Sequence, residues 1–463
     1  MVSRTLETLG VRFASISAIG LGFLAGACEA PSTSTPEDTQ TATSTLSDPA
    51  ANAASTYARQ WMTNVAFSVK LDGVNPPIAS RSYAYAAIAA YEAVVHGMPG
   101  NVSLAGQING LDSLPVPDPG KTYDWPTVLA ATMGRVVPAT YVFPNTLFFE
   151  YTTATRVSLG AMERVQIAKR LVQAGVAQSV VDDSTTYGHA LGDAIAAWAN
   201  ADGFAEARYA AYEPPVGPGQ WKATGYVNAQ TTRPLLPHFG RVRPVALTAP
   251  EDCLPAAPPP FDPTPGSDFY NQANAVYQTD LALTKEQREI ALFWADGNGS
   301  ETPPGHWVKI TNDLIRTQNL AVAVRAYLPV AVAMFDAGIA TWHAKYFYNT
   351  ERPETYVHDH ISTQWITLLP TPQFPSYTSG HSGFSMAAAT ALTDVFGNVS
   401  FTDRTKVRGG FKAVTFSNFT AAADQASLSR LYGGIHYPMD NEAGKTLGAC
   451  AANAFINRVN LEM

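Results

Sequence analysis

The chain has 463 residues, of which 46% are hydrophobic and 15% are charged, a composition typical of a globular protein with a large buried core. Its formal net charge is −8 and no basic block or stripe is present. No nucleic-acid partner is therefore expected, because a phosphate backbone is bound by clustered Lys and Arg.

Residues 1–27 have the pattern of an export signal. Two arginines precede an apolar run over residues 13–27, which is too short for a comfortable membrane span. The small residues before Cys28 are similar to a bacterial lipobox, although Ala25 stands where Leu is usual. Lipidation of Cys28 and ordinary cleavage after Ala27 both agree with this pattern. We therefore expect an exported protein, periplasmic or at the cell surface, that is lipid-anchored if Cys28 is acylated.

Residues 28–51 are rich in Ser, Thr and Pro and lack apolar periodicity, so we expect a solvated tether that belongs to no core. Beyond Cys28, the chain contains only Cys253 and Cys450. In an oxidising compartment these two residues can form a disulfide, but their separation in sequence does not reveal their geometry. Two buried free thiols remain an equal alternative.

Helical periodicity dominates from residue 52 onward, and strand signals are sparse. Two short β-like pieces, at residues 399–402 and 414–415, are expected to be loop. The Pro-rich residues 213–266 exclude regular helix and predict a long ordered excursion over the surface. We therefore expect an all-α protein of helical bundle architecture with long Pro-rich loops. The predicted helices cover residues 52–67, 82–96, 125–137, 160–178, 187–200, 270–281, 284–294 and 318–347.

The helix predicted at residues 318–347 is strongly apolar, but charged residues and Pro329 interrupt it, so we expect a buried helix that bends or divides at Pro329. Near its end, Lys345 and Arg352 are seven residues apart, which is nearly two helical turns. On one helix they would present two cations on the same face, and unpaired cations that face inward require an anion. Taken alone, a solvated helix end is the simpler explanation of the pair.

A second motif, Ser379-Gly380-His381, joins an aromatic loop to a small-residue run that predicts a helix. Glycine lets the backbone approach a ligand closely, and a serine hydroxyl can donate a hydrogen bond. The first amides of a helix also point unpaired N–H groups outward. The motif therefore suits an anion site with an acid or base attached, although a capped helix start with a surface histidine is the simpler explanation of this segment alone.

A third motif lies before the last predicted helix and contains Arg430, His436 and Asp440. Arg430 can supply another guanidinium fork, and His436 lies on a loop where its imidazole can face a pocket. Asp440 can orient neighbouring groups or cap the helix through its carboxylate.

The three motifs occur in order as Lys-x6-Arg-Pro at 345–353, Ser-Gly-His at 379–381 and Ser-Arg-x5-His-x3-Asp at 429–440. Together they resemble the signature shared by vanadium-dependent haloperoxidases and the type 2 phosphatidic acid phosphatase superfamily, which includes bacterial acid phosphatases. Thr378 stands where Pro usually precedes Ser-Gly-His, which removes no ligand. The resemblance is strong over residues 284–458. It implies two packed four-helix bundles, with an N-terminal helical region at 52–283 and a catalytic region at 284–463.

The resemblance also implies roles for the motif residues. His436 would bind axially to vanadium, or attack phosphorus in a phosphatase, and His381 would move a proton on the opposite side. Lys345 would also polarise bound peroxide, and Asp440 would support these groups from behind. The equatorial oxygens of the oxyanion would be held by Lys345, Arg352, Arg430, the Ser379 hydroxyl and the Gly380 amide.

Vanadate and phosphate are nearly isosteric, so the motifs do not choose between a peroxidase and a phosphatase. Trp342 and Phe374 match positions where haloperoxidases place aromatic walls, and LFWADG resembles a haloperoxidase stretch whose Asp, here Asp296, pairs with Arg430. The resemblance therefore favours vanadate-dependent oxidation of a halide by hydrogen peroxide to hypohalous acid. Phosphoester hydrolysis through a phosphohistidine at His436 is the alternative, and a non-catalytic, anion-storing lipoprotein is a third. The sequence identifies neither the halide nor the oligomeric state.

Overall fold

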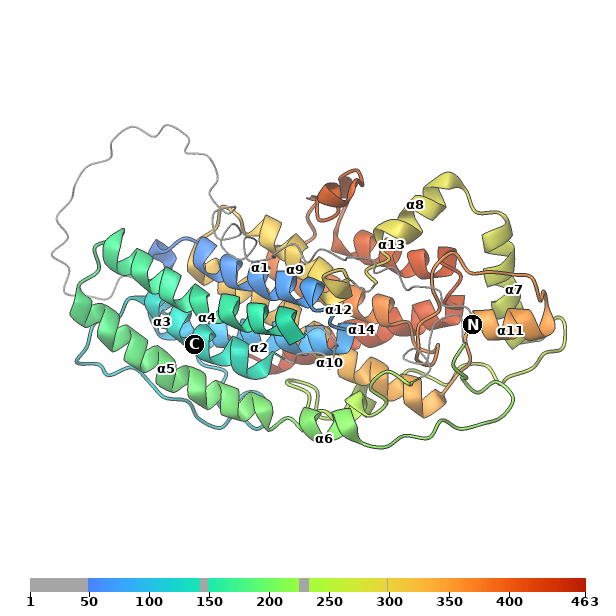
Figure 1. Ribbon diagram of the computed structural model, residues 1–463, viewed down its shortest axis with the longest axis horizontal. Coiled ribbons are helices and arrows are strands. Elements are labelled where there is room, and N and C mark those ends of the chain that lie inside the picture. Colours follow the sequence, from blue (N-terminus) through green and yellow to red (C-terminus); the bar gives the residue numbers. More distant parts are fainter. Residues whose placement is uncertain (1–48, 142–148, 225–232, 298) are drawn as a thin grey trace, which may run out of the picture. The chain divides into compact units, whose positions relative to one another are not determined.

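The computed structural model describes residues 49–141, 149–224, 233–297 and 299–463 (Figure 1). The predicted export signal, Cys28 and most of the predicted tether lie outside the described residues. Within residues 46–463 the chain forms one compact unit. Apart from one two-stranded sheet, the regular elements of the described residues are helices, which confirms the all-α prediction.

The N-terminal helices pack around α3, which contacts α1, α2, α4 and α5. Polar caps set where these helices begin. The Asn75 side chain accepts from Ile78 N ahead of α2, and the Asp124 side chain accepts from Thr127 N ahead of α3. A proline occupies the first turn of each, where its missing N–H has no helical partner to lose. The bounds are α1 (Thr56–Leu71), α2 (Pro76–Val94), α3 (Trp125–Thr140), α4 (Phe149–Val172) and α5 (Gln178–Asn200).

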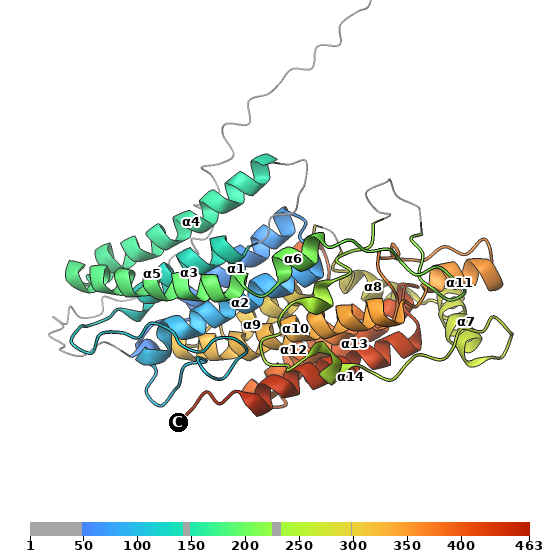
Figure 2. The ribbon, with the colours of Figure 1, turned by 90° about the horizontal axis from the view of Figure 1, so that it is seen from below.

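A second group of four long helices lies in the C-terminal part: α10 (Leu320–Tyr348), α12 (Gly380–Phe396), α13 (Phe419–Tyr432) and α14 (Pro438–Arg458). Figure 2 shows α10, α12 and α14 running side by side, and they contact one another. Helix α10 also packs along α2, and α9 (Thr302–Leu314) contacts helices of both groups. Both groups therefore share one apolar core, and this arrangement fits the expected pair of four-helix bundles.

The remaining elements are short. The described part of the Pro-rich excursion contains only single 3-10 turns, as its proline content predicts. Their bounds are α6 (Phe204–Tyr209), α7 (Asp268–Leu281), α8 (Lys285–Phe293), α11 (Pro353–His360), β1 (Phe401–Asp403), β2 (Val414–Phe416), η2 (Ala50–Asn52), η3 (Val95–Gly97), η4 (Phe239–Arg241), η5 (Pro250–Cys253) and η6 (Val407–Gly409).

One sequence-based expectation is wrong, and of the two outcomes expected at Pro329 one does not occur. The β-like pieces expected to be loop form β1 and β2, an antiparallel pair in which Phe401 lies opposite Phe416. Their rings stack at a centroid distance of 5.6 Å, and Phe401 also stacks on Phe419 at 4.9 Å. A strand of only three residues gives too little periodicity to be recognised in the sequence. The aromatic packing that stabilises this pair joins separate segments, which a local pattern does not reveal. In addition, Pro329 does not divide α10, which is one helix from end to end.

Helix α10 is the one helix in the described residues that is long and apolar enough to cross a membrane. Of its most apolar 18-residue window, 83% is buried inside the protein. The prediction of a buried core helix is therefore confirmed, since contacts with α2, α12 and α14 account for its composition.

The Pro-rich excursion is fixed to α10 by a buried carboxylate. Asp336 is fully buried, and it accepts hydrogen bonds from the amides of Val245 at 2.7 Å, Ala246 at 2.7 Å and Leu247 at 3.0 Å. Burial raises the pKa of Asp336 to about 6, although the three amides oppose this shift. The excursion is thus held at a defined position along the central helix.

A disulfide holds the same excursion to α14. Cys253, at the end of η5, is bonded to Cys450, and their Cα atoms are 5.7 Å apart. The sequence left open whether these cysteines form a disulfide or remain free thiols. The fold decides for the disulfide, because it brings together two residues that are 197 positions apart in the sequence.

Loss of the Cys253–Cys450 bond is expected to destabilise the protein. A native disulfide contributes about 2–5 kcal/mol by restricting the unfolded chain. The double variant Cys253→Ser/Cys450→Ser should therefore have a lower free energy of unfolding by roughly that amount in a denaturant titration. A reducing agent should destabilise the wild type and leave the variant unchanged. Equal stability of the two proteins without reductant would contradict this prediction.

Candidate functional site

Lys345 and Arg352 do not share one helix, so the expectation of two cations on one helical face is wrong. Helix α10 ends where Asn349 adopts the left-handed conformation, with φ of 50°. Arg352 is extended, with φ of −83° and ψ of 153°, as the following Pro353 requires. The two cations converge nevertheless. Lys345 Nζ and Arg352 Cζ each lie 4.9 Å from the centroid of the Phe374 ring.

The Lys345 ammonium is fully buried and holds the loop that leads into α12. It donates to the carbonyl oxygens of Pro375 and Ser376, each at 2.9 Å, and to that of Thr378. These bonds use all three of its hydrogens, so a direct bond from Lys345 to an oxyanion requires one of them to exchange. Burial and the nearby Arg352 charge lower the pKa of Lys345.

Ser379 and Gly380 lie at the start of α12. Ser379 is the N-cap residue: its Oγ accepts from Ser382 N at 3.4 Å, and its own amide donates to the Asp440 carbonyl at 2.9 Å. Gly380 is the first helical residue and lines a small cavity. The N-terminus of α12 therefore lies at this cavity, and the buried Ser379 hydroxyl caps it.

His436 is held by a carboxylate on one side and a guanidinium on the other. Its Nδ1 lies 2.9 Å from Asp440 Oδ2, and its Nε2 lies 3.1 Å from Arg352 Nη1. Because Arg352 only donates, Nδ1 carries the proton and Nε2 keeps its lone pair. Burial and the surrounding cations lower the pKa of His436 well below its usual value. Asp440 Oδ2 also accepts from Ser376 Oγ at 2.5 Å and Tyr437 N at 3.1 Å.

Arg430 lies on α13, and the prediction that it forms an ion pair with Asp296 is wrong. Among the ion pairs of the described residues, Asp296 binds His306 Nδ1 at 2.8 Å and Lys406 Nζ rather than Arg430. Arg430 Nη1 instead donates to the carbonyl oxygen of Trp294 at 3.0 Å. The Asp296 carboxylate still raises the pKa of Arg430 through its charge, against a larger lowering by burial. Asp296 therefore influences Arg430 through its charge, without a direct ion pair.

Three buried nitrogen atoms in this region have no hydrogen-bond partner among the described residues: Arg352 Nη2, Arg430 Nε and His381 Nε2. A cavity of about 40 Å³ lies beside them, and its lining includes Trp342 and Phe374, whose rings are 5.1 Å apart. Arg352 Nη2 and Arg430 Nε are unsatisfied buried donors, which are costly, so the region requires a ligand with acceptor oxygens. A tetrahedral or trigonal-bipyramidal oxyanion such as vanadate fits this need.

The charge of the site also favours an oxyanion. Lys345, Arg352 and Arg430 are almost fully buried, and Asp440 is the carboxylate that accompanies them. Burial lowers the pKa of Arg352 to about 9 and that of Arg430 to about 10, so both guanidinium groups stay charged at neutral pH. Cations therefore outnumber carboxylates around the cavity.

His381 follows Gly380 and is only partly buried, although its Nε2 is enclosed. Its Nε2 has no hydrogen-bond partner among the described residues, and the backbone of Trp294 and Ala295 lies near enough to favour the charged ring slightly. Burial and the Arg430 charge lower the pKa of His381 well below its usual value. The imidazole is therefore neutral near pH 7, with a free lone pair at Nε2.

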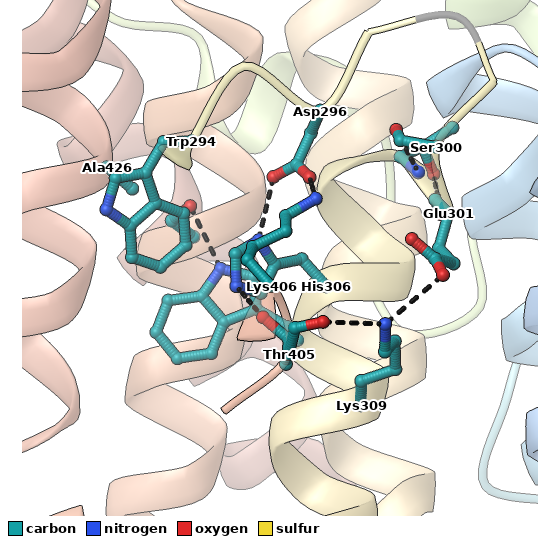
Figure 3. Close-up of polar contacts among 12 residues, drawn as sticks. Trp294, Asp296, Ser300, Glu301, His306, Lys309, Thr405, Lys406 and Ala426 are labelled. Carbon is teal, nitrogen blue, oxygen red and sulfur yellow. Dashed lines mark hydrogen bonds and ion pairs between the residues drawn. The ribbon is translucent and has the colours of Figure 1, made fainter. Parts of the chain in front are cut away.

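A polar cluster behind Arg430 was not predicted from the sequence. Figure 3 shows Asp296 between His306 and Lys406. His306 Nε2 also lies 2.8 Å from Asp403 Oδ2, and Trp294 stacks on the imidazole at 4.4 Å. Although burial opposes it, the two carboxylates raise the pKa of His306 to about 9. His306 is therefore an imidazolium that holds the segment from which Trp294 supports the site. The sequence analysis predicted no helix around His306, because two prolines at the start of α9 weaken the helical pattern there.

Residues 325–462 match a family model described as the VCPO second helical-bundle domain. Among solved structures, the chain is similar to the first bacterial vanadium-dependent iodoperoxidase, at 33% identity and a TM-score of 0.79, over 89% of this chain and 98% of that one. It is also similar to a bacterial vanadium-dependent chloroperoxidase. Its holo form has 15% identity and a TM-score of 0.60, over 83% of this chain and 94% of that one. Its apo form has 16% identity and a TM-score of 0.58, over 84% of this chain and 94% of that one. No curated protein matches the sequence.

The buried His306 imidazolium predicts a specific dependence of stability on pH. Its folded pKa of about 9 lies above its usual value of 6.5, so the stabilisation is fully present below about pH 6.5 and is lost as the pH rises through 9. His306→Gln should lower the free energy of unfolding at pH 6.5 by on the order of 3 kcal/mol. It should also flatten the fall in stability between pH 6.5 and 9.5.

The measurement is denaturant unfolding at a series of pH values. His189→Gln is the matched control, because the His189 side chain is 39% exposed on α5 and contacts neither Asp296 nor Asp403. Parallel stability curves for the wild type and His306→Gln would show that the imidazolium makes no such contribution.

Proposed function

Because this chain belongs to the vanadium-dependent haloperoxidase family, we propose that it oxidises a halide to hypohalous acid with hydrogen peroxide. The protein is an enzyme with vanadate as its cofactor, and the finer proposal concerns the reaction. The observation that carries it is the set of unpartnered nitrogens of Arg352, Arg430 and His381 at a cationic site beside His436. One halide ion, one peroxide molecule and one proton give one hypohalous acid and one water.

The residues that would hold vanadate follow from their free donors. Arg352 Nη2 and Arg430 Nε would donate to its oxygens, together with the Ser379 hydroxyl and the Gly380 amide. His436 Nε2, which accepts from Arg352 Nη1 at 3.1 Å, would offer its lone pair to the metal once that bond exchanges, and Asp440 keeps the proton on Nδ1. Bound vanadate supplies a Lewis acid that makes peroxide electrophilic toward halide without a change in vanadium oxidation state.

The proton chemistry belongs to His381. Its Nε2 is enclosed, unpartnered and neutral near pH 7, so it can accept the proton that hydrogen peroxide loses as it enters the site. Trp342 and Phe374 wall the small cavity and exclude water. The Lys345 ammonium adds positive charge to the loop that carries Ser379, and one of its hydrogens becomes available if a carbonyl bond exchanges.

We propose iodide as the halide to test first, because the relative at 33% identity is described as an iodoperoxidase. The chloroperoxidase structures share only 15% and 16% identity, so they support the fold alone. The small cavity beside Trp342 and Phe374 has no feature that separates iodide from bromide.

Vanadate is expected to activate halide oxidation and to inhibit any phosphatase activity, because both oxyanions compete for the same donors. The protein is purified without metal and assayed with hydrogen peroxide and iodide, bromide or chloride, and separately with a phosphomonoester. Each assay is run with and without vanadate. Vanadate-free hydrolysis of the phosphoester, together with background halide oxidation when vanadate is present, would replace this proposal with the phosphatase alternative.

The two motif histidines are expected to respond differently to alanine substitution. His436→Ala removes the nitrogen ligand, so vanadate binding should weaken and turnover should collapse. His381→Ala leaves Arg352 and Arg430 in place, so binding should persist while turnover falls by roughly 10²–10⁴-fold, the usual contribution of a positioned proton carrier. Equilibrium dialysis measures the binding and peroxide-dependent iodide oxidation measures the turnover. The opposite pattern would exchange the two roles.

We also propose that the protein is exported. The support is the signal-like pattern of residues 1–27 together with the Cys253–Cys450 disulfide, since such bonds persist in oxidising compartments. Mass spectrometry of the mature N-terminus should find a chain that begins at Cys28, acylated if a lipid anchor is present. A chain that retains Met1 would contradict export.

A further inference from the structure

A row of buried hydroxyl groups leads away from the oxyanion site behind Ser379. Ser379 Oγ lies 3.0 Å from Ser382 Oγ, and Ser382 Oγ lies 2.8 Å from Ser427 Oγ. The first two residues are on α12 and the third is on α13. All three are at most 2% exposed, so the row runs through the protein interior.

The row ends at a second cavity, of about 330 Å³, between α13 and α14. Ser427 and Asn441 form its buried wall. Its rim is charged and accessible: Lys445 binds Asp424 at 3.1 Å and Glu442 at 3.0 Å, and the Glu442 side chain is 71% exposed. Solvent can therefore reach the outer end of the row.

The hydrogen bonds give the row a direction. Ser382 Oγ donates its single hydrogen to Ser379 Oγ, which also accepts from Ser382 N. With both bonds accepted, the Ser379 hydroxyl still has its own hydrogen to donate, and the next residue, Gly380, lines the small cavity of the oxyanion site. Ser382 in turn accepts from Ser427, which is the shorter contact. The competing acceptor, Asn441 Oδ1, is farther from Ser382 Oγ at 3.3 Å.

Close helix packing keeps the row dry between its ends. Helix α14 passes α12 at Gly444, where an added Cβ would lie 2.5 Å from the Ser379 carbonyl oxygen and 2.8 Å from Ser382 Cβ. No side chain larger than glycine fits there without a backbone shift. The hydroxyl groups therefore contact one another directly.

We propose that Ser427, Ser382 and Ser379 form a proton relay from the cavity between α13 and α14 to the oxyanion site. The inference rests on the proposed halide oxidation, which consumes one proton in each turnover. A hydronium ion in the cavity gives a proton to Ser427 Oγ, and each hydroxyl passes its own hydrogen to the next oxygen. Ser379 gives its hydrogen to an oxygen at the site. One proton is thereby moved, the three serines are regenerated, and each hydroxyl then rotates back.

The test compares alanine variants at the middle and outer positions of the relay, Ser382 and Ser427, with a matched control. Ser382→Ala and Ser427→Ala each break the row, and Ser427→Thr keeps the hydroxyl and places its methyl group toward the cavity. Ser385→Ala is the control, because Ser385 is buried on α12 but bonds Trp307 Nε1 at 3.0 Å instead. Vanadate affinity is measured by equilibrium dialysis. Iodide turnover is measured against pH, in water and in deuterium oxide.

In both alanine variants, iodide turnover should fall by roughly 10- to 100-fold, most at high pH where protons are scarce, and the solvent isotope effect should increase. Ser427→Thr and Ser385→Ala should retain wild-type turnover. Vanadate affinity should stay within about twofold of the wild type, because the relay moves protons and does not hold the anion.

Two results would overturn the relay while leaving the proposed function intact. One is unchanged turnover and isotope effect in both alanine variants. The other is weaker vanadate binding with an unchanged isotope effect, which would show that the row only orients Ser379. A wild type that oxidises no halide with vanadate present would instead remove the proposed function, and the relay with it.

Discussion

Three cations are buried around the oxyanion site, where Asp440 is the carboxylate that accompanies them, and the site depends on how that burial is stabilised. Removing an unpaired charge from water costs on the order of several kcal/mol. Hydrogen bonds to backbone carbonyl oxygens offset part of this cost for Lys345, Arg352 and Arg430. The bond from Arg430 to the Trp294 carbonyl is one example. A carbonyl satisfies a donor without cancelling its charge, so positive potential remains for an oxyanion.

Reliance on carbonyls makes the position of several loops part of the site. Lys345 fixes the loop before α12, and the His306 imidazolium fixes the segment that contains Trp294. The Pro-rich excursion also contributes, because the Trp342 indole donates to the Leu235 carbonyl at 3.0 Å. Asp336 and the disulfide hold that excursion at other points along the chain. Interactions outside the cavity therefore set the geometry inside it.

The site has two kinds of surroundings. On one side is the small cavity of about 40 Å³, whose aromatic walls limit access by water. On the other side the serine row leads to the larger polar cavity of about 330 Å³. In the proposed reaction, the oxidant and the protons approach from different directions, so that the cationic site need not open to bulk solvent.

The sequence by itself determined the helical class, the buried character of α10 and the identity of the motif residues. Helical periodicity reports burial along one element, and motif spacing reports chemistry, so both are readable from one chain. Tertiary structure alone decided the partners. It placed Arg352 beyond the end of α10, paired Asp296 with His306 instead of Arg430, and joined Cys253 to Cys450. Such choices depend on which distant segments meet in space, and local sequence patterns carry no information about that distance.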